Sequence, residues 1–122
     1  GFSTGQPWLA VNPNYQAINV QEALANPDSI FYTYQKLVQI RKENSWLIRA
    51  DFELLDTADK VFAYIRKDGD RRFLVVANLS NEKQDLAVEG TVKSVLIENT
   101  AAQEAFEKQS LAPWDAFCVE LL

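Results

Sequence analysis

The pattern of apolar and polar residues changes its period near Arg49, from helical spacing before it to a period of two after it. Between residues 28 and 44 apolar side chains recur every three or four positions, which predicts one long helix. After Arg49, short apolar or alternating runs are separated by turn sequences. These runs are residues 52–54, 61–66, 73–79, 85–88, 94–97 and 116–121. Their spacing predicts an antiparallel β-sandwich or curled sheet, so the fold class is mainly β.

The third run, residues 73–79, is apolar at almost every position. Such a run is typical of a central strand that is covered on both faces. The Asp-Gly pair at residues 68–69 comes just before it and predicts a tight hairpin with the second run. Residues 99–109 have a helical composition, but we predict a loop there with one helical turn at most.

The N-terminal third of the chain has a different character. Residues 1–18 are rich in glycine, proline and asparagine, which predicts an irregular loop. Asn19 followed by Glu22 has the spacing of a capping box and predicts the start of a short helix. The Asn-Pro pair at residues 26–27 is expected to end that helix, because the residue before a proline disfavours helical geometry.

A longer helix is predicted to begin at Asp28 or Ser29, whose side chains can accept hydrogen bonds from the first free amides, and to end near residue 44. Its apolar arc covers about 180°, wider than the roughly 100° stripe of a surface helix. The arc contains Ile30, Phe31, Tyr34, Leu37, Val38 and Ile40. We therefore expect two packing partners, and self-association where one is missing. Arg41 lies within the arc, which predicts either an ion pair with a buried carboxylate or a stem along the apolar surface.

Composition narrows the classes of function. The 122 residues are 48% apolar and carry a formal net charge of −5, so they can form a core and repel phosphate backbones. We expect no nucleic-acid partner and no membrane partner, since no apolar run is long enough to cross a bilayer. The single Cys118 is predicted to be a buried, inert thiol in a reducing compartment. The absence of methionine suggests a piece of a longer protein.

The residue types and their spacing argue against several kinds of chemical site. The chain has no histidine, which excludes histidine-based triads and His/Cys zinc sites, and we expect no cofactor and no metal ion. Residues 68–70 are too short for a calcium loop. Residues 78–80 match a glycosylation sequon but end a core strand, so we discount it. Trp46 and Trp114 are predicted to pack between helix and sheet.

Residues 1–15, GFSTGQPWLAVNPNY, carry the strongest family signal. This run resembles the α-glucosidases of glycoside hydrolase family 13, in the branch of the oligo-1,6-glucosidases, dextran glucosidases and phosphotrehalases. The resemblance continues through residues 19–24 and 28–37 to residues 40–44, and it weakens to a strand pattern after residue 50. It implies that residues 1–48 are the terminal loop and helices of a (β/α)8 catalytic barrel. Residues 49–122 would then be the C-terminal antiparallel β domain.

The resemblance also implies a function. The longer protein would be a retaining enzyme that hydrolyses α-1,6 bonds at the non-reducing ends of isomalto-oligosaccharides or dextran, in the cytoplasm. The family's catalytic carboxylates precede this segment, so we assign no catalytic residue, and only Trp8 and Tyr15 are candidates near the sugar site. The 17 acidic residues are interpreted as surface charge. The chain alone would be an inactive brace whose partners are the missing barrel and, in the whole enzyme, glucan oligosaccharides. The alternatives are the tail of a phosphotrehalase or sucrose isomerase, and a free-standing carbohydrate-binding module.

Overall fold

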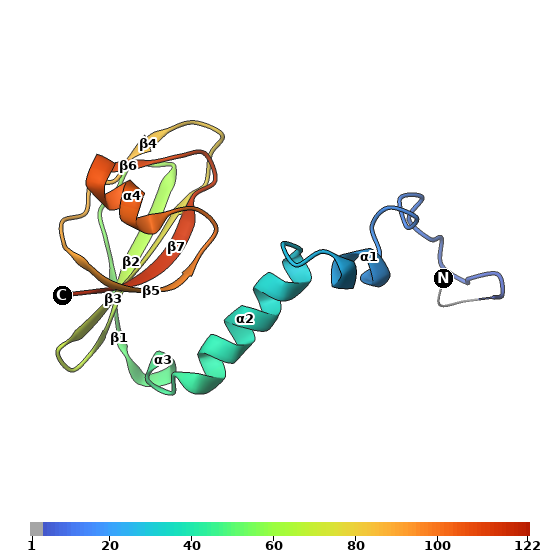
Figure 1. The fold of residues 1–122 in the computed structure, drawn as a ribbon, viewed down its shortest axis with the longest axis horizontal. Helices are drawn as coiled ribbons and strands as arrows, with labels where there is room; N and C mark the ends of the chain where they lie inside the picture. The colour runs from blue at the N-terminus through green and yellow to red at the C-terminus, as the bar shows by residue number, and fades with distance from the viewer. Residues whose placement is uncertain (1–3) are drawn as a thin grey trace. The chain divides into compact units, whose positions relative to one another are not determined.

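A computed structural model describes residues 4–122 of the chain. The chain divides into two compact units, Gly1–Gln39 and Ile40–Leu122. Helix α2, Ile30–Glu43, begins in the first unit and ends in the second. Each unit is described by itself, and the elements are labelled in Figure 1.

The first unit contains an irregular loop, helix α1 (Val20–Ala25) and most of α2. The Asn19 side chain accepts a hydrogen bond from the Glu22 amide at 2.9 Å, which confirms the predicted N-cap of α1. The helix ends at Asn26, as the following proline requires. Helix α2 begins at Ile30, directly after the predicted start residues Asp28 and Ser29. The Ser29 hydroxyl donates to the Ala23 carbonyl at 2.7 Å and so links the two helices.

Helix α2 has no buried residue. The apolar arc inferred from the sequence is therefore open to solvent, with Ile30, Tyr34 and Val38 exposed. Arg41 is also exposed and forms no salt bridge within residues 4–122, so the predicted ion pair is not found in this part of the protein.

The second unit is a β-sandwich with a five-stranded antiparallel sheet in the order β1-β2-β3-β7-β5. Its strands are β1 (Asp51–Leu54), β2 (Val61–Asp68), β3 (Arg71–Asn78), β5 (Val92–Glu98) and β7 (Ala116–Leu121). A second, two-stranded sheet pairs β4 (Gln84–Asp85) with β6 (Ser110–Leu111). The β2–β3 hairpin turns at Gly69, whose φ of 60° favours glycine, as the Asp-Gly pair predicts.

The core lies between the large sheet and a second layer made of helix α4 (Ala102–Lys108) and the β4–β6 pair (Figure 1). Side chains that alternate along β2, β3 and β7 point into it, including Ala63, Leu74 and Val119. From the second layer come Leu86, Val88, Ala102, Ala105, Phe106 and Leu111. The predicted mainly antiparallel β fold is confirmed.

Two predictions about this unit are wrong in detail, and one short helix was missed. Residues 102–108 form helix α4, longer than the single turn expected. The fourth run is a strand only over Gln84–Asp85, although Leu86 and Val88 beyond it are buried in the core. The short helix α3, Trp46–Arg49, was not anticipated.

The outer face of the large sheet carries a second set of apolar residues. The strand register places Phe52, Tyr64, Phe73, Val75 and Cys118 on it. Phe73 is buried there because the Trp46 ring of α3 stacks on it with ring centroids 3.8 Å apart. Val75 beside it is only half-buried. The central strand is thus covered at Leu74 and Val76 on its core face and only in part on its outer face, so the predicted cover on both faces holds in part.

Candidate functional site

Trp8 and Tyr15, the residues that the sequence singles out for sugar contact, lie in the loop before α1. Successive turns around Pro13 shape this loop, because the Tyr15 amide donates to the Asn12 carbonyl at 3.1 Å. The Asn19 side-chain amide donates to the Tyr15 carbonyl at 2.9 Å, so the backbone of Tyr15 is held on both sides. The side chain of Trp8 is 93% exposed and that of Tyr15 is about half as exposed. Within the first unit no described residue covers the Trp8 ring.

Several carboxylates of the described residues form ion pairs with lysine or arginine side chains. The pKa values of Glu53, Glu82 and Glu104 are lowered, in each case first by a hydrogen bond from a lysine. Those lysines are Lys67, Lys60 and Lys108, respectively. A general acid for glycoside hydrolysis needs the opposite shift, a raised pKa. These three side chains are therefore unsuited to that role. Within residues 4–122 no group of three or more His, Cys, Asp or Glu residues could hold a metal ion.

Glu120 is the most strongly shifted of the carboxylates. Its side chain is only 8% exposed on the outer face of β7, and it accepts hydrogen bonds from Arg71 Nε and Lys93 Nζ, each at 3.0 Å. These bonds lower the pKa of Glu120 from 4.5 to about 2. Arg71 also lies over the Phe73 ring, 4.5 Å from its centroid. The cluster thus joins three charged side chains and an aromatic ring across β3, β5 and β7, which indicates a structural role.

Replacing Glu120 by glutamine should therefore change how stability depends on pH. The pKa is lowered in the folded state, so the carboxylate stabilises the fold above pH 4.5 and loses that effect as the pH falls toward about 2. We expect Glu120→Gln to unfold at a lower urea concentration than the wild type at pH 7. The difference should shrink between pH 4.5 and about 2. A difference that is the same at both ends of this range would show that the ion pairs are not its cause.

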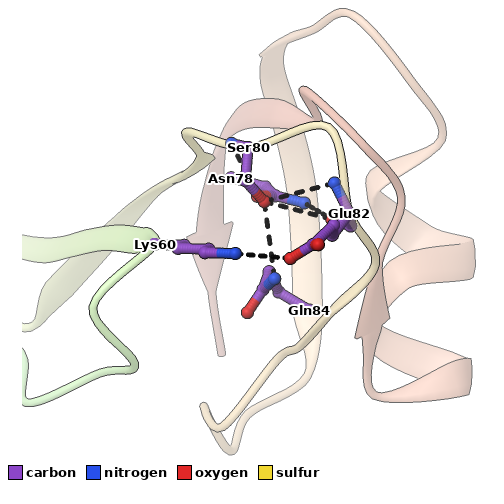
Figure 2. Close-up of polar contacts among 5 residues, drawn as sticks. All are labelled: Lys60, Asn78, Ser80, Glu82 and Gln84. Atoms are coloured by element: carbon purple, nitrogen blue, oxygen red, sulfur yellow. Dashed lines mark hydrogen bonds and ion pairs between the residues drawn. The ribbon is translucent and has the colours of Figure 1, made fainter.

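A second polar cluster closes the other end of β3 (Figure 2). Asn78, only 2% exposed, donates from Nδ2 to the carbonyls of Glu82 and Ala112, both at 2.8 Å. Its Oδ1 accepts from the Ser80 amide at 3.1 Å and from the Ser80 hydroxyl at 2.8 Å. Lys60 reaches the same loop through its ion pair with Glu82. Both amide hydrogens of Asn78 are thus engaged, which agrees with discounting the sequon.

Trp114 does not pack between helix and sheet as predicted, because it occupies a turn before β7. Its φ is 64°, and its side chain is 60% exposed. Trp46, in contrast, is buried against Phe73, so the packing prediction holds for that residue alone. Beside the turn lies a cavity of about 280 Å³ whose walls combine alanine and proline side chains with polar and charged ones. Nothing in the sequence pattern pointed to this cavity.

Cys118 is half-buried on the outer face of the sheet, and burial raises the pKa of its thiol to about 11. A thiol with so high a pKa is almost wholly protonated at neutral pH and is a poor nucleophile. This agrees with the inert thiol expected from the sequence. Among residues 4–122 no helix is long and apolar enough to cross a membrane.

Comparison with known families divides the chain near residue 51. Residues 1–50 match the family described as alpha amylase, catalytic domain, and residues 52–117 match the maltogenic amylase, C-terminal domain. The second match covers more than half of the chain.

Curated relatives match the chain over its whole length. It is 92% identical over all 122 residues to the glucan 1,6-alpha-glucosidase of Streptococcus pneumoniae, of which it covers 23%. It is 37% identical to the oligo-1,6-glucosidase of Bacillus cereus, with 99% of the chain and 23% of that protein covered. The chain thus spans about a quarter of the length of these relatives.

Solved structures of related enzymes also match the chain over nearly its whole length. The trehalulose synthase of Pseudomonas mesoacidophila matches with a TM-score of 0.86 and 33% identity, over 100% of this chain and 23% of that one. The trehalose-6-phosphate hydrolase of Bacillus licheniformis matches with a TM-score of 0.83 and 33% identity, over 99% of this chain and 23% of that one. With its β-sandwich and its matches on both sides of residue 51, the chain belongs to the alpha-amylase family, glycoside hydrolase family 13.

Proposed function

We propose that this chain is the C-terminal portion of a retaining α-glucosidase that hydrolyses α-1,6 bonds at the non-reducing ends of isomalto-oligosaccharides and dextran. The observation that carries the proposal is the 92% identity to a glucan 1,6-alpha-glucosidase over every residue of the chain. Identity to the trehalose-6-phosphate hydrolase of Bacillus subtilis is 34% over a similar length. A phosphotrehalase is therefore less favoured, and so is a sucrose isomerase.

The proposal assigns residues 1–48 to the end of the catalytic barrel and residues 49–122 to the β domain. The two family matches, which meet between residues 50 and 52, support this division. The continuous match of residues 1–50 to a catalytic domain also speaks against a free-standing carbohydrate-binding module. The open apolar arc of α2 supports a missing partner, which we take to be the rest of the barrel. In that longer protein Trp8 and Tyr15 would lie near the sugar site, and the protein would work in the cytoplasm.

The chain by itself would then act as a brace without activity. A retaining glycosidase needs two carboxyl groups about 5 Å apart, one of them a general acid. The carboxylates described above have lowered pKa values and lysine or arginine partners, which supports a structural role for them.

The substrate assignment can be tested on a longer protein that carries this chain at its C-terminal end. We expect it to release glucose from isomaltotriose and to leave trehalose 6-phosphate and sucrose unchanged, while the 122-residue chain alone hydrolyses none of them. Trp8→Ala in the longer protein should raise the KM for isomaltotriose. Preferred hydrolysis of trehalose 6-phosphate would transfer the assignment to the phosphotrehalases. If the repurified 122-residue chain alone hydrolysed isomaltotriose, the proposal that it has only a structural role would be wrong.

The same proposal predicts that the isolated chain self-associates through α2. Ile30, Phe31, Tyr34, Gln35 and Val38 line a shallow groove of about 430 Å³ on this helix. Covering an apolar side chain contributes about 1.5–3 kcal/mol, so a second copy is a favourable substitute for a missing barrel. Light scattering should detect a dimer or larger species, and Leu37→Glu, which charges the exposed arc, should shift it toward monomer. A wild type that stays monomeric at high concentration would contradict the need for a second partner.

A further inference from the structure

Trp114 combines exposure with an unusual backbone. It is 60% exposed and has a φ of 64°, a left-handed conformation that glycine adopts at less cost than a residue with a bulky side chain. Pro113 precedes it, and the Asp115 amide donates to the Ala112 carbonyl at 3.2 Å, which closes a tight turn. Stability alone would favour glycine at this position. A strained, exposed aromatic residue is therefore a reason to look for a role for its ring.

Hydrogen bonds from neighbouring segments fix the backbone of the turn that carries this ring. The Trp114 amide donates to the Ser80 carbonyl at 3.1 Å, and the Trp114 carbonyl accepts from Asn99 Nδ2 at 2.8 Å. Asp115 Oδ2 accepts from the Ala112 amide at 2.7 Å. Since both peptide groups of Trp114 are fixed, the ring projects from a preorganised base, and little backbone entropy is lost when a ligand binds it.

The cavity of about 280 Å³ adjoins the turn, because Pro113 and Asp115 on either side of Trp114 line it. Asp115 is 4% exposed, and its Oδ1 atom has no hydrogen-bond partner within residues 4–122. The Ser110 hydroxyl in the same wall is likewise without a partner there. The polar and charged residues of the lining are Lys83, Thr100, Glu104, Lys108, Ser110 and Asp115. The cavity thus offers charged and hydroxyl side chains at its rim, and two of its lining residues, Ser110 and Asp115, each have a buried polar atom without a partner in the described part of the chain.

We propose that Trp114 and this cavity form a second, non-catalytic binding site for α-1,6-linked glucan. One glucose ring stacks on the indole, and the hydroxyl groups of the adjoining unit bind the polar side chains of the cavity. An apolar platform beside a few convergent polar groups is the arrangement that sugar rings require, since they present both C–H faces and hydroxyl edges. The proposal rests on the proposed function for the identity of the sugar. It deepens that function, because a polymeric substrate can contact the β domain as well as the barrel.

The first test uses the nuclear magnetic resonance signals of the three indole N–H groups of the chain, those of Trp8, Trp46 and Trp114. Titration with isomaltotriose should shift the Trp114 signal and leave that of the buried Trp46 unchanged. Sorbitol, a polyol without a ring, should shift neither. No movement of the Trp114 signal at any isomaltotriose concentration, or the same movement with sorbitol, would overturn the proposal.

The second test compares variants by native electrophoresis in gels with and without dextran. Dextran should retard the wild type, and Trp114→Gly, which keeps the turn, should abolish most of the retardation while Trp114→Tyr keeps part of it. Phe52→Ala is the matched control, because Phe52 is similarly exposed, at 58%, and lies on the outer face of the sheet. Equal retardation of Trp114→Gly and the wild type would overturn the site. Neither test requires turnover, so failure here and failure of isomaltotriose hydrolysis by the longer protein are separate results.

Discussion

Replacing Asn78 by alanine should lower the free energy of unfolding of the β domain by about 4 kcal/mol, since it removes four hydrogen bonds worth roughly 0.5–1.5 kcal/mol each. The alanine also removes the Asn78 donor from the Ala112 carbonyl and from the Glu82 carbonyl, which keeps only the Ser80 hydroxyl at 3.2 Å. The loss is a large part of a typical domain stability of about 5–15 kcal/mol. Urea unfolding followed by circular dichroism measures it.

Two variants separate the hydrogen bonds of Asn78 from other effects of mutation at this strand end. Asn78→Asp has nearly the same shape but cannot donate to two carbonyls, so it should be destabilised about as strongly as Asn78→Ala. Leu79→Ala changes the next residue, which is 64% exposed, and should alter stability by about 0.5 kcal/mol or less. If Asn78→Asp were as stable as the wild type, the donated hydrogen bonds would not hold the loop.

The strands of the β domain could be predicted from the sequence because each signal is local. Alternation along residues 61–66 and the Asp-Gly turn at residues 68–69 fix one hairpin, and the structure pairs these residues as expected. The same reasoning could not place Leu86 and Val88, which are buried but not in a strand. An apolar residue in a sequence indicates that its side chain is buried, but a buried residue need not be part of a β-strand.

The ends of helix α4 explain why the sequence predicts only one helical turn after residue 98. Its start has no capping side chain of its own at Ala101. The cap comes from the preceding strand, where Glu98 Oε2 accepts from the Ala102 amide at 2.8 Å. The helix ends at Gln109 in the left-handed conformation, where glycine is the usual signal. Both ends therefore lack the residues by which helices are recognised in sequences.

The candidate sugar residues illustrate a different limit. Trp8 and Tyr15 are candidates through a family resemblance alone, and the described loop leaves both side chains exposed. The sequence predicts that Trp114 packs between helix and sheet, as large aromatic side chains commonly do. The structure instead places it in a tight turn after a proline, with a φ of 64° and a side chain that is 60% exposed. Sequence patterns predict burial better than they predict such exceptions.

Replacing Trp46 by alanine should destabilise the β domain by about 3–5 kcal/mol, the usual cost of removing a buried large aromatic side chain. Trp46 is 9% exposed and stacks on Phe73 at an interplanar angle of 14°, and its Nε1 donates to Asn44 Oδ1 at 2.9 Å. Its loss uncovers Phe73, which is 1% exposed in the wild type, and breaks the bond that joins α3 to the residue after α2. Thermal unfolding followed by circular dichroism should show a midpoint lower by at least about 12 °C, at roughly 4–8 °C per kcal/mol for a domain of this size. Trp114→Ala removes an equally large side chain from an exposed turn and should shift the midpoint by a few degrees at most, so equal shifts in the two variants would contradict the assignment of Trp46 as the aromatic cover of the sheet.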